Sequence, residues 1–408
     1  MSAGLGDARA LLLFLSFAAA YFLSALLRAV TATLAPVFST ELGLKAADLG
    51  LLAGAYFLGF SAMQLPLGSA LDRWGPKRVL LSLLGVGLLG CAGFAMAQGF
   101  AGLLLTRVLV GIGVSACLMA PLTAYRQRFT AEAQLRANSW MLMTGSLGML
   151  ASTLPVQWLL PVLGWRGLFW LLAALLALAM GLLMRMVPAD ATLMPPGLRT
   201  QGSYREVFAN PLFRRMLPLG LLPYGGMVAV QSLWAGPWLT RVCGWTQLEA
   251  ARGLFVLNLA MLCTFFAWGM LMPRLVARGW NALRLLRWLM PVAIGLLLLA
   301  VALGARSGVW AWVLFCVACS VVSLSQPAVA QVFPTALAGR ALSAFNLAIF
   351  AGVFFVQWGV GLLVDALLAR SWSTESAFQG AFVMLATGCA AAYLWFVRAP
   401  RGATAGEG

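Results

Sequence analysis

Two arginines interrupt long apolar stretches of the sequence, and their guanidinium groups are the clearest candidates for chemistry. Arg28 lies in the stretch 11–36 and Arg107 in the stretch 101–125. An ionisable side chain at membrane depth is costly and usually functional, and a guanidinium can hold a carboxylate or phosphate through two parallel hydrogen bonds. Arg28 therefore predicts a site for a small anion. Arg107 lies nearer the outer end of its stretch, where its side chain can also reach the membrane surface, so a functional and a structural role are equally good explanations. A structural role, in which each caps backbone carbonyls or pairs with a neighbour, is the alternative.

Neutral polar and aromatic side chains at similar depth complete the predicted site. Gln231 is the strongest candidate because it follows Tyr224 by seven residues, as Arg28 follows Tyr21. Arginine in one half and neutral groups in the other favour a monoanionic or small polar substrate over a dianion held by two arginines. For each neutral residue, hydrogen bonding between helices is an equally good explanation. The candidates are Tyr21, Tyr56, Gln231, Trp234, Asn258, Gln326, Asn346 and Gln357.

Acidic residues are nearly absent from the apolar stretches. Asp365, in the stretch 343–369, is the exception, and a location near the membrane surface is its simpler interpretation. A carboxylate relay for protons is therefore disfavoured, and coupling is expected from anion exchange or from a proton carried with the substrate. The sequence has no histidine and no phosphate-binding glycine loop, so we expect no metal, no cofactor and no ATP-driven transport.

A dense polar cluster separates the second and third apolar stretches. It runs from Gly68 to Arg78, and its predicted functional residues are Gly68, Asp72, Arg73, Gly75, Lys77 and Arg78. Gly75 and Pro76 permit a tight turn between two helices. The basic residues suit a loop that fixes orientation, but Asp72 adds little to such a signal. The pattern therefore predicts an electrostatic latch at Asp72.

Composition shows which elements must position these residues. With 62% hydrophobic residues, 9% charged residues and a mean hydropathy of +0.93, the chain predicts a polytopic membrane protein. The net charge of +16 is then a topology signal and not a sign of nucleic acid, because most Lys and Arg lie on one side if both termini are cytoplasmic. Trp165 and Trp238 are among the tryptophans expected at the membrane interface. Taking about twenty residues per crossing, the sequence predicts twelve spans: 11–36, 48–70, 79–98, 101–125, 139–163, 166–187, 214–239, 250–272, 285–305, 309–331, 343–369 and 377–397.

The longest polar segment, 188–213, divides these spans into two halves that resemble each other. It predicts an N-terminal six-helix bundle (1–187), a cytoplasmic linker (188–213) and a C-terminal six-helix bundle with a short tail (214–408). Val156-Gln157-Trp158 recurs as Val356-Gln357-Trp358, which indicates an internal duplication.

The motif from Gly68 to Arg78, together with two six-helix halves and a central loop, resembles the major facilitator superfamily of secondary transporters. Arg107-Val-Leu-Val-Gly111-Ile-Gly113 resembles a second pattern of that family. The resemblance implies an all-α membrane fold of two pseudosymmetric bundles and alternating access. It also implies that Asp72 meets the start of the eleventh span, near residues 340–343. In the second half of the chain Pro273 stands where the acid would be, so the latch is expected on one side only.

The resulting functional prediction is a multi-pass transporter of the bacterial inner membrane, monomeric in the lipid bilayer, for a small organic anion or other small polar solute. A coupling proton or counter-substrate is expected, and no nucleic acid partner. The alternatives are a proton-linked exporter of amphiphilic or drug-like compounds, and a transporter-like sensor or assembly factor.

Overall fold

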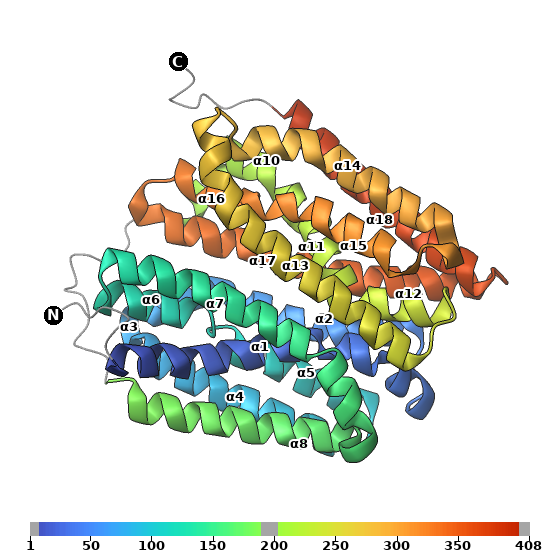
Figure 1. Ribbon diagram of the computed structural model, residues 1–408, viewed down its shortest axis with the longest axis horizontal. Coiled ribbons are helices and arrows are strands. Elements are labelled where there is room, and N and C mark those ends of the chain that lie inside the picture. Colours follow the sequence, from blue (N-terminus) through green and yellow to red (C-terminus); the bar gives the residue numbers. More distant parts are fainter. Residues whose placement is uncertain (1–7, 189–202, 400–408) are drawn as a thin grey trace. The chain divides into compact units, whose positions relative to one another are not determined.

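The computed structural model describes residues 8–188 and 203–399, and its regular elements in these ranges are helices (Figure 1). The chain forms two compact units. Unit 1 comprises Met1–Ala35 and Ala55–Arg199, and unit 2 comprises Pro36–Gly54 and Thr200–Gly408. The segment 36–54 therefore packs with the second unit although it lies early in the sequence. The division into bundles 1–187 and 214–408 stays a prediction.

Unit 1 is built from eight helices, the first two of which contribute the segment 36–54 to unit 2. They are α1 (Ala8–Glu41), α2 (Ala46–Ala62), α3 (Gln64–Trp74), α4 (Pro76–Met96), α5 (Phe100–Val114), α6 (Met119–Arg128), α7 (Ala131–Ala151) and α8 (Leu154–Met186).

Unit 2 mixes long α-helices with short helices of other pitch. Its α-helices are α9 (Tyr204–Ala209), α10 (Pro211–Leu219), α11 (Gly225–Ala229), α12 (Ala235–Arg241), α13 (Gln247–Ala277), α14 (Ala282–Leu303), α15 (Gly308–Cys319), α16 (Ser325–Val332), α17 (Thr335–Leu368) and α18 (Thr374–Arg398). Two π-helical segments, η2 (Gly220–Tyr224) and η3 (Val230–Trp234), interrupt the α10–α12 stretch, and two 3₁₀ segments are η4 (Gly304–Arg306) and η5 (Ser320–Leu324).

The helices account for the predicted spans. Within the described residues, ten are long and apolar enough to cross a membrane, and α2 with α3 forms an eleventh that bends by 45°. The predicted span 139–163 consists of the second half of α7 and the start of α8. A left-handed glycine, Gly164 (φ 62°), then turns the chain, so the remainder of α8 is the predicted span 166–187. The chain is thus an all-helical, multi-pass membrane protein.

Close helix packing in each unit depends on glycine. A Cβ atom on Gly111 of α5 would lie 2.0 Å from the carbonyl oxygen of Tyr56 on α2, and one on Gly352 of α17 would lie 2.0 Å from that of Leu221 in η2. Small residues drive helix association in a bilayer because they let backbones approach. Gly111 therefore brings the backbone of α2, and with it Tyr56, against the helix that carries Arg107.

The end of the predicted linker 188–213 is helical, contrary to the prediction of an irregular polar segment. Residues 189–202 lie outside the described residues, but α9 and the start of α10 follow directly. Ser203 and Glu206 form a reciprocal capping box at the start of α9, and Asn210 caps α10 ahead of Pro211. Both are recognisable start signals for helices in the sequence.

Two tryptophans that were predicted as interface anchors lie inside the units instead. Trp165 is buried against Phe94, and Trp238 has an exposed fraction of 0%. Trp238 packs edge-on to Trp312 with ring centroids 4.9 Å apart and donates its indole N–H to Ser307 Oγ at 2.9 Å. A buried hydrogen-bond partner satisfies the indole N–H as well as interfacial water would. The position of a tryptophan at a span end therefore does not show whether it is buried or lies at the membrane interface.

Candidate functional site

Arg107 is a buried cation with spare hydrogen-bonding capacity. Its side chain is 1% exposed, and its Nη2 donates to the Leu27 carbonyl oxygen at 2.9 Å and to Thr31 Oγ1, both on α1. Its Nε and Nη1 make no hydrogen bond to any residue that the structure describes. Buried donors are nearly always satisfied, so two orphan nitrogens on one guanidinium require an explanation.

The aromatic ring of Tyr56 covers this guanidinium. The Arg107 Cζ atom lies 5.4 Å from the ring centroid, within the range of a cation–π contact. The Tyr56 hydroxyl donates to the Ser24 carbonyl oxygen on α1 at 3.2 Å, which fixes the ring. The predicted residues Arg107 and Tyr56 are therefore brought together, and α1, α2 and α5 position them.

Arg28 lies beside the same aromatic pair. Its Cζ is 5.6 Å from the centroid of Phe60, and the Phe60 and Tyr56 rings stack with centroids 6.0 Å apart. Arg28 is half-buried, unlike Arg107. One turn of α2 separates Tyr56 from Phe60, so this helix presents one ring to each arginine. Phe60 was not predicted, because nothing distinguishes it from other aromatic residues in an apolar stretch.

Tyr21 is used in packing. It is buried on α1, and its ring fills the space beside Gly145 of α7, where a Cβ atom would lie 2.5 Å from the ring. It lies two turns before Arg28 on the same helix.

In unit 2, the predicted residue Gln231 lies within the π-helical segment η3. Its Nε2 donates to Asn258 Oδ1 on α13 at 3.0 Å, and Asn258 Nδ2 donates to the Leu254 carbonyl oxygen at 2.9 Å. Trp234, also in η3, is buried, and its Nε1 has no hydrogen-bond partner among the described residues. π-Helical turns inside α-helices occur frequently at functional sites. The prolines Pro218 and Pro223 in this stretch were the available sequence signal for irregular backbone.

Gln357 of α17 also has a buried polar atom without a hydrogen-bond partner among the described residues. Its side chain is 0% exposed, and its Nε2 donates to Ser232 Oγ in η3 at 3.0 Å. Its Oε1 accepts no hydrogen bond from the described residues. The amide therefore offers one free acceptor in the interior of the unit.

Gln326 and Asn346 form a separate network with Tyr224. Gln326 Nε2 donates to Asn346 Oδ1 at 2.6 Å, and the Tyr224 hydroxyl lies 3.4 Å from Gln326 Oε1. The structure thus brings together Gln231 with Asn258, and Gln326 with Asn346, in two clusters.

The polar hairpin is a one-residue connection between α3 and α4. Gly75 has φ 80° and Pro76 begins α4, as the sequence predicted. Asp72, Arg73 and Arg78 are exposed, and the Arg73 Cζ atom lies 5.4 Å from the Trp74 ring centroid. Gly68 is open around its α-carbon. The meeting of Asp72 with the start of α17 stays a prediction.

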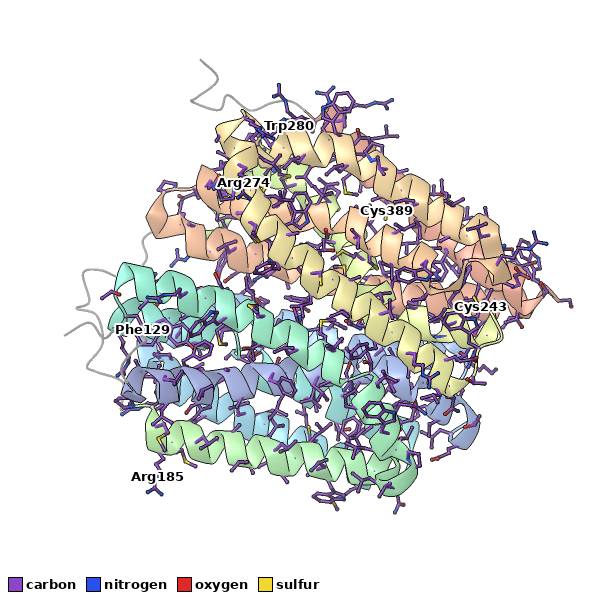
Figure 2. The ribbon with its side chains drawn as sticks, in the orientation of Figure 1. Phe129, Arg185, Cys243, Arg274, Trp280 and Cys389 are labelled. Atoms are coloured by element: carbon purple, nitrogen blue, oxygen red, sulfur yellow. The ribbon has the colours of Figure 1, made fainter. Side chains whose placement is uncertain are left out.

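Lys77 has a role that the sequence did not indicate. Its Nζ donates to the carbonyl oxygens of Met184, at 2.8 Å, and Val187, at the end of α8. A cation there satisfies orphan carbonyls and complements the helix dipole. Arg185, on the same last turn, points away from α8 instead (Figure 2).

Comparisons with known proteins point to a family of membrane transporters. The sequence model of the Major Facilitator Superfamily matches residues 17–357. A probable L-galactonate transporter of Escherichia coli is 29% identical over 32% of this chain and 28% of its own length, and a cis,cis-muconate transport protein of Acinetobacter baylyi is 28% identical over 45% and 46%. The methyl viologen resistance protein SmvA of Salmonella typhimurium is 33% identical over 38% and 32%. The chain thus matches less than half the length of each of these relatives.

The fold comparison extends over almost the whole chain. The crystal structure of a D-xylose–proton symporter has a TM-score of 0.76 at 15% sequence identity, and the match covers 96% of this chain and 98% of the symporter. At that identity the likeness concerns the fold alone.

Proposed function

The chain belongs to the Major Facilitator Superfamily, and on that premise we propose that it is a secondary transporter that moves a small organic anion across the bacterial inner membrane by alternating access. The superfamily is one of transporters and not of enzymes. Alternating access, the anionic substrate and the orientation of the termini are parts of the proposal.

The observation that carries the proposal is the buried Arg107, with two nitrogens unused by the described residues. Oxygen atoms of an organic anion can accept from both nitrogens, but from different edges of the planar guanidinium: the carboxylate accepts from one and a further substrate oxygen from the other. No acidic residue occurs in the sequence of α1 before Glu41, of α2 after Asp48 or of α5. An entering anion therefore meets cationic charge without a competing carboxylate on these helices.

Unit 2 has unused neutral groups of its own. The free Oε1 of Gln357 and the free Nε1 of Trp234 can accept from and donate to hydroxyl or carbonyl groups of a substrate. Such neutral groups suit the hydroxyl and carbonyl oxygens of a polar substrate. The relatives named for L-galactonate and cis,cis-muconate transport support an organic anion as the substrate, with one carboxylate in the first compound and two in the second.

A reconstitution experiment tests the proposal. Purified protein in liposomes loaded with unlabelled L-galactonate should take up labelled L-galactonate by exchange, and L-galactose, which lacks the carboxylate, should not compete. A parallel measurement uses cis,cis-muconate. Replacing Arg107 with Gln should reduce exchange at least about tenfold, since hydrogen bonds to charged groups are worth about 1.5–3 kcal/mol each. Equal exchange by the variant, or equal competition by L-galactose, would contradict the anion site.

The second candidate is export of amphiphilic compounds, which the match to the methyl viologen resistance protein favours. Methyl viologen is a dication, so a buried arginine would oppose its binding. Under this alternative, proton-dependent efflux of methyl viologen would persist or increase in the Arg107→Gln variant. If the substrate is an organic anion, neither the wild type nor the Arg107→Gln variant transports methyl viologen.

A further inference from the structure

The end of the first helical hairpin is fastened to unit 2. We call residues 36–54 the α1–α2 tip: it holds the last turns of α1, the connecting loop and the first half of α2, and it groups with unit 2 while the rest of both helices groups with unit 1. Pro36, inside α1, has no N–H to donate to the preceding turn, and Gly54 ends the tip in α2. Both positions at which the chain passes between units therefore have the residue types that weaken a helix locally.

The first amides of α2 are satisfied partly from another helix. Lys45 N–H donates to Asp48 Oδ2 at 3.0 Å, within the tip itself. Ala46 N–H donates to Asp365 Oδ1 at 3.2 Å, and Ala47 N–H donates to Asp365 Oδ2 at 2.8 Å. A single carboxylate from near the end of α17 therefore caps two amides of α2, where the positive end of the helix dipole also attracts it.

Arg241, at the end of α12, contributes a second polar contact. Its Nη2 donates to Ser39 Oγ in the last turns of α1 at 2.5 Å. It also lies near enough to Asp365 for mutual electrostatic attraction. Asp365 and Arg241 thus bind the two sides of the tip and attract each other.

Backbone packing places Asp365 in register with the start of α2. A Cβ atom on Gly50 would lie 2.2 Å from the Gln357 carbonyl oxygen, and one on Gly361 would lie 2.3 Å from that of Ala46. Residues later in α17 thus face residues earlier in α2, so the two helices run antiparallel. Asp365 follows Gly361 by one turn of α17 and therefore lies beside the first residues of α2. Helices in such close contact separate cooperatively, because they lose the cap and the packing together.

We propose that Asp365 and Arg241 form a polar clasp that holds the α1–α2 tip on α17, and that its release is an obligatory step of the transport cycle. The clasp is distinct from the latch predicted at Asp72, since it acts at the start of α2. The two carboxylates make a reciprocal pair in the sequence: Asp72 is near the end of the second span and Asp365 is near the end of the eleventh. The obligatory step rests on the proposed transport function, whereas the clasp itself does not.

Hydrogen exchange of the amides at 46 and 47 measures the clasp without any substrate. In the Asp365→Asn variant we expect these amides to exchange at least about tenfold faster than in the wild type, because the charge-assisted hydrogen bonds are lost. The matched control is Glu375→Gln: Glu375 Oε1 likewise accepts a backbone N–H, that of Ala305 at 2.8 Å, but it does not touch the tip. Unchanged exchange in Asp365→Asn, or an equal increase in Glu375→Gln, would overturn the clasp.

Distances between spin labels measure release of the tip. Thr40 in the tip and Ser371 after α17 are exposed and can be replaced by labelled cysteines once the accessible Cys243 and Cys263 are changed to Ser, because the five other cysteines are buried. We expect Asp365→Asn or Arg241→Gln to add a longer-distance population that the wild type has only weakly. If both variants show the same single distance between the spin labels as the wild type, the clasp is overturned.

The exchange of L-galactonate then tests the link to the cycle. We expect a changed turnover number in Asp365→Asn with the Arg107 site intact. Faster amide exchange at 46–47 together with unaltered turnover would overturn the obligatory step while leaving the clasp and the proposed function in place. Absence of transport in the wild type would count against the proposed function alone, since amide exchange still reports on the clasp.

Discussion

Replacing Arg107 with Met separates a functional arginine from a structural one. The change removes the two side-chain hydrogen bonds made by Nη2 and the contact with the Tyr56 ring, which together are worth about 4–8 kcal/mol. It also removes a buried charge whose Nε and Nη1 are unbonded within the described structure, and such a charge costs several kcal/mol to bury. The two effects oppose each other and are similar in size.

We therefore expect Arg107→Met to change stability by no more than about 1–2 kcal/mol, or a few degrees in melting temperature. Transport of an organic anion should fall by about 100-fold or more, because the loss of two charge-assisted hydrogen bonds corresponds to about 3 kcal/mol. Arg107→Lys keeps the charge without the planar fork and should give an intermediate loss. Intrinsic tryptophan fluorescence during heating in detergent gives the melting temperature, and liposome exchange gives the transport rate.

Arg215 supplies the control for loss of a buried arginine. Its Nε donates to the Phe396 carbonyl oxygen at 2.6 Å, and its Cζ lies 4.7 Å from the Phe396 ring, so it ties α10 to the last turn of α18. Arg215→Met should lower the melting temperature more than Arg107→Met does and should reduce transport only in proportion to folded protein. The reverse order, with Arg107→Met the less stable variant and its transport loss explained by unfolding, would refute the reasoning.

Three further variants test the described contacts. Lys77→Met leaves the last carbonyls of α8 without their cation and should destabilise the protein by about 1–2 kcal/mol, with Lys77→Arg close to wild type, as measured by thermal unfolding. Gly111→Ala places a methyl group 2.0 Å from the Tyr56 carbonyl oxygen. We expect it to lower the free energy of unfolding by about 2 kcal/mol or more and to weaken anion exchange. Gly181→Ala, where a Cβ atom has no neighbour within 4 Å, is the control and should be neutral. Gln357→Leu removes both the orphan Oε1 and the hydrogen bond from Nε2 to Ser232 Oγ, and because these effects oppose each other, stability should change by no more than about 1 kcal/mol while the KM for a hydroxylated anion increases. A marked drop in melting temperature would assign Gln357 to packing.

Features set by local chemistry were predictable from the sequence. The spans follow from the length of each apolar stretch, and the turn at Gly75-Pro76 follows from the conformations those two residues permit. The partners of charged residues were not predictable, because they lie far away in the sequence: Lys77 contacts residues 107 and 110 positions later, and Asp365 contacts residues 318 and 319 positions earlier. No local pattern encodes a pairing of that length.

The candidate site shows the same limit. Arg28, Arg107 and Gln357 stood out because charge and amide groups are rare in apolar stretches. Phe60 did not stand out, since its importance comes only from lying under the Arg28 guanidinium. The π-helical turns at 220–224 and 230–234 depend on packing against neighbouring helices, and prolines only hint at them.

Because lysine is scarce in this chain, amine-reactive reagents can modify only a few positions. Only Lys45 and Lys77 occur among the 408 residues; Lys45 lies within the α1–α2 tip, directly before α2, and Lys77 caps α8. Lys45 is exposed, whereas the Lys77 ammonium is engaged by two carbonyls, so an amine-reactive acylating reagent should modify Lys45 first. Apart from the N-terminal amine, mass spectrometry then needs to follow only two peptides. Acylation of Lys45 thus reports on the start of α2, which Asp365 caps, and acylation of Lys77 reports on the end of α8, which Lys77 itself caps.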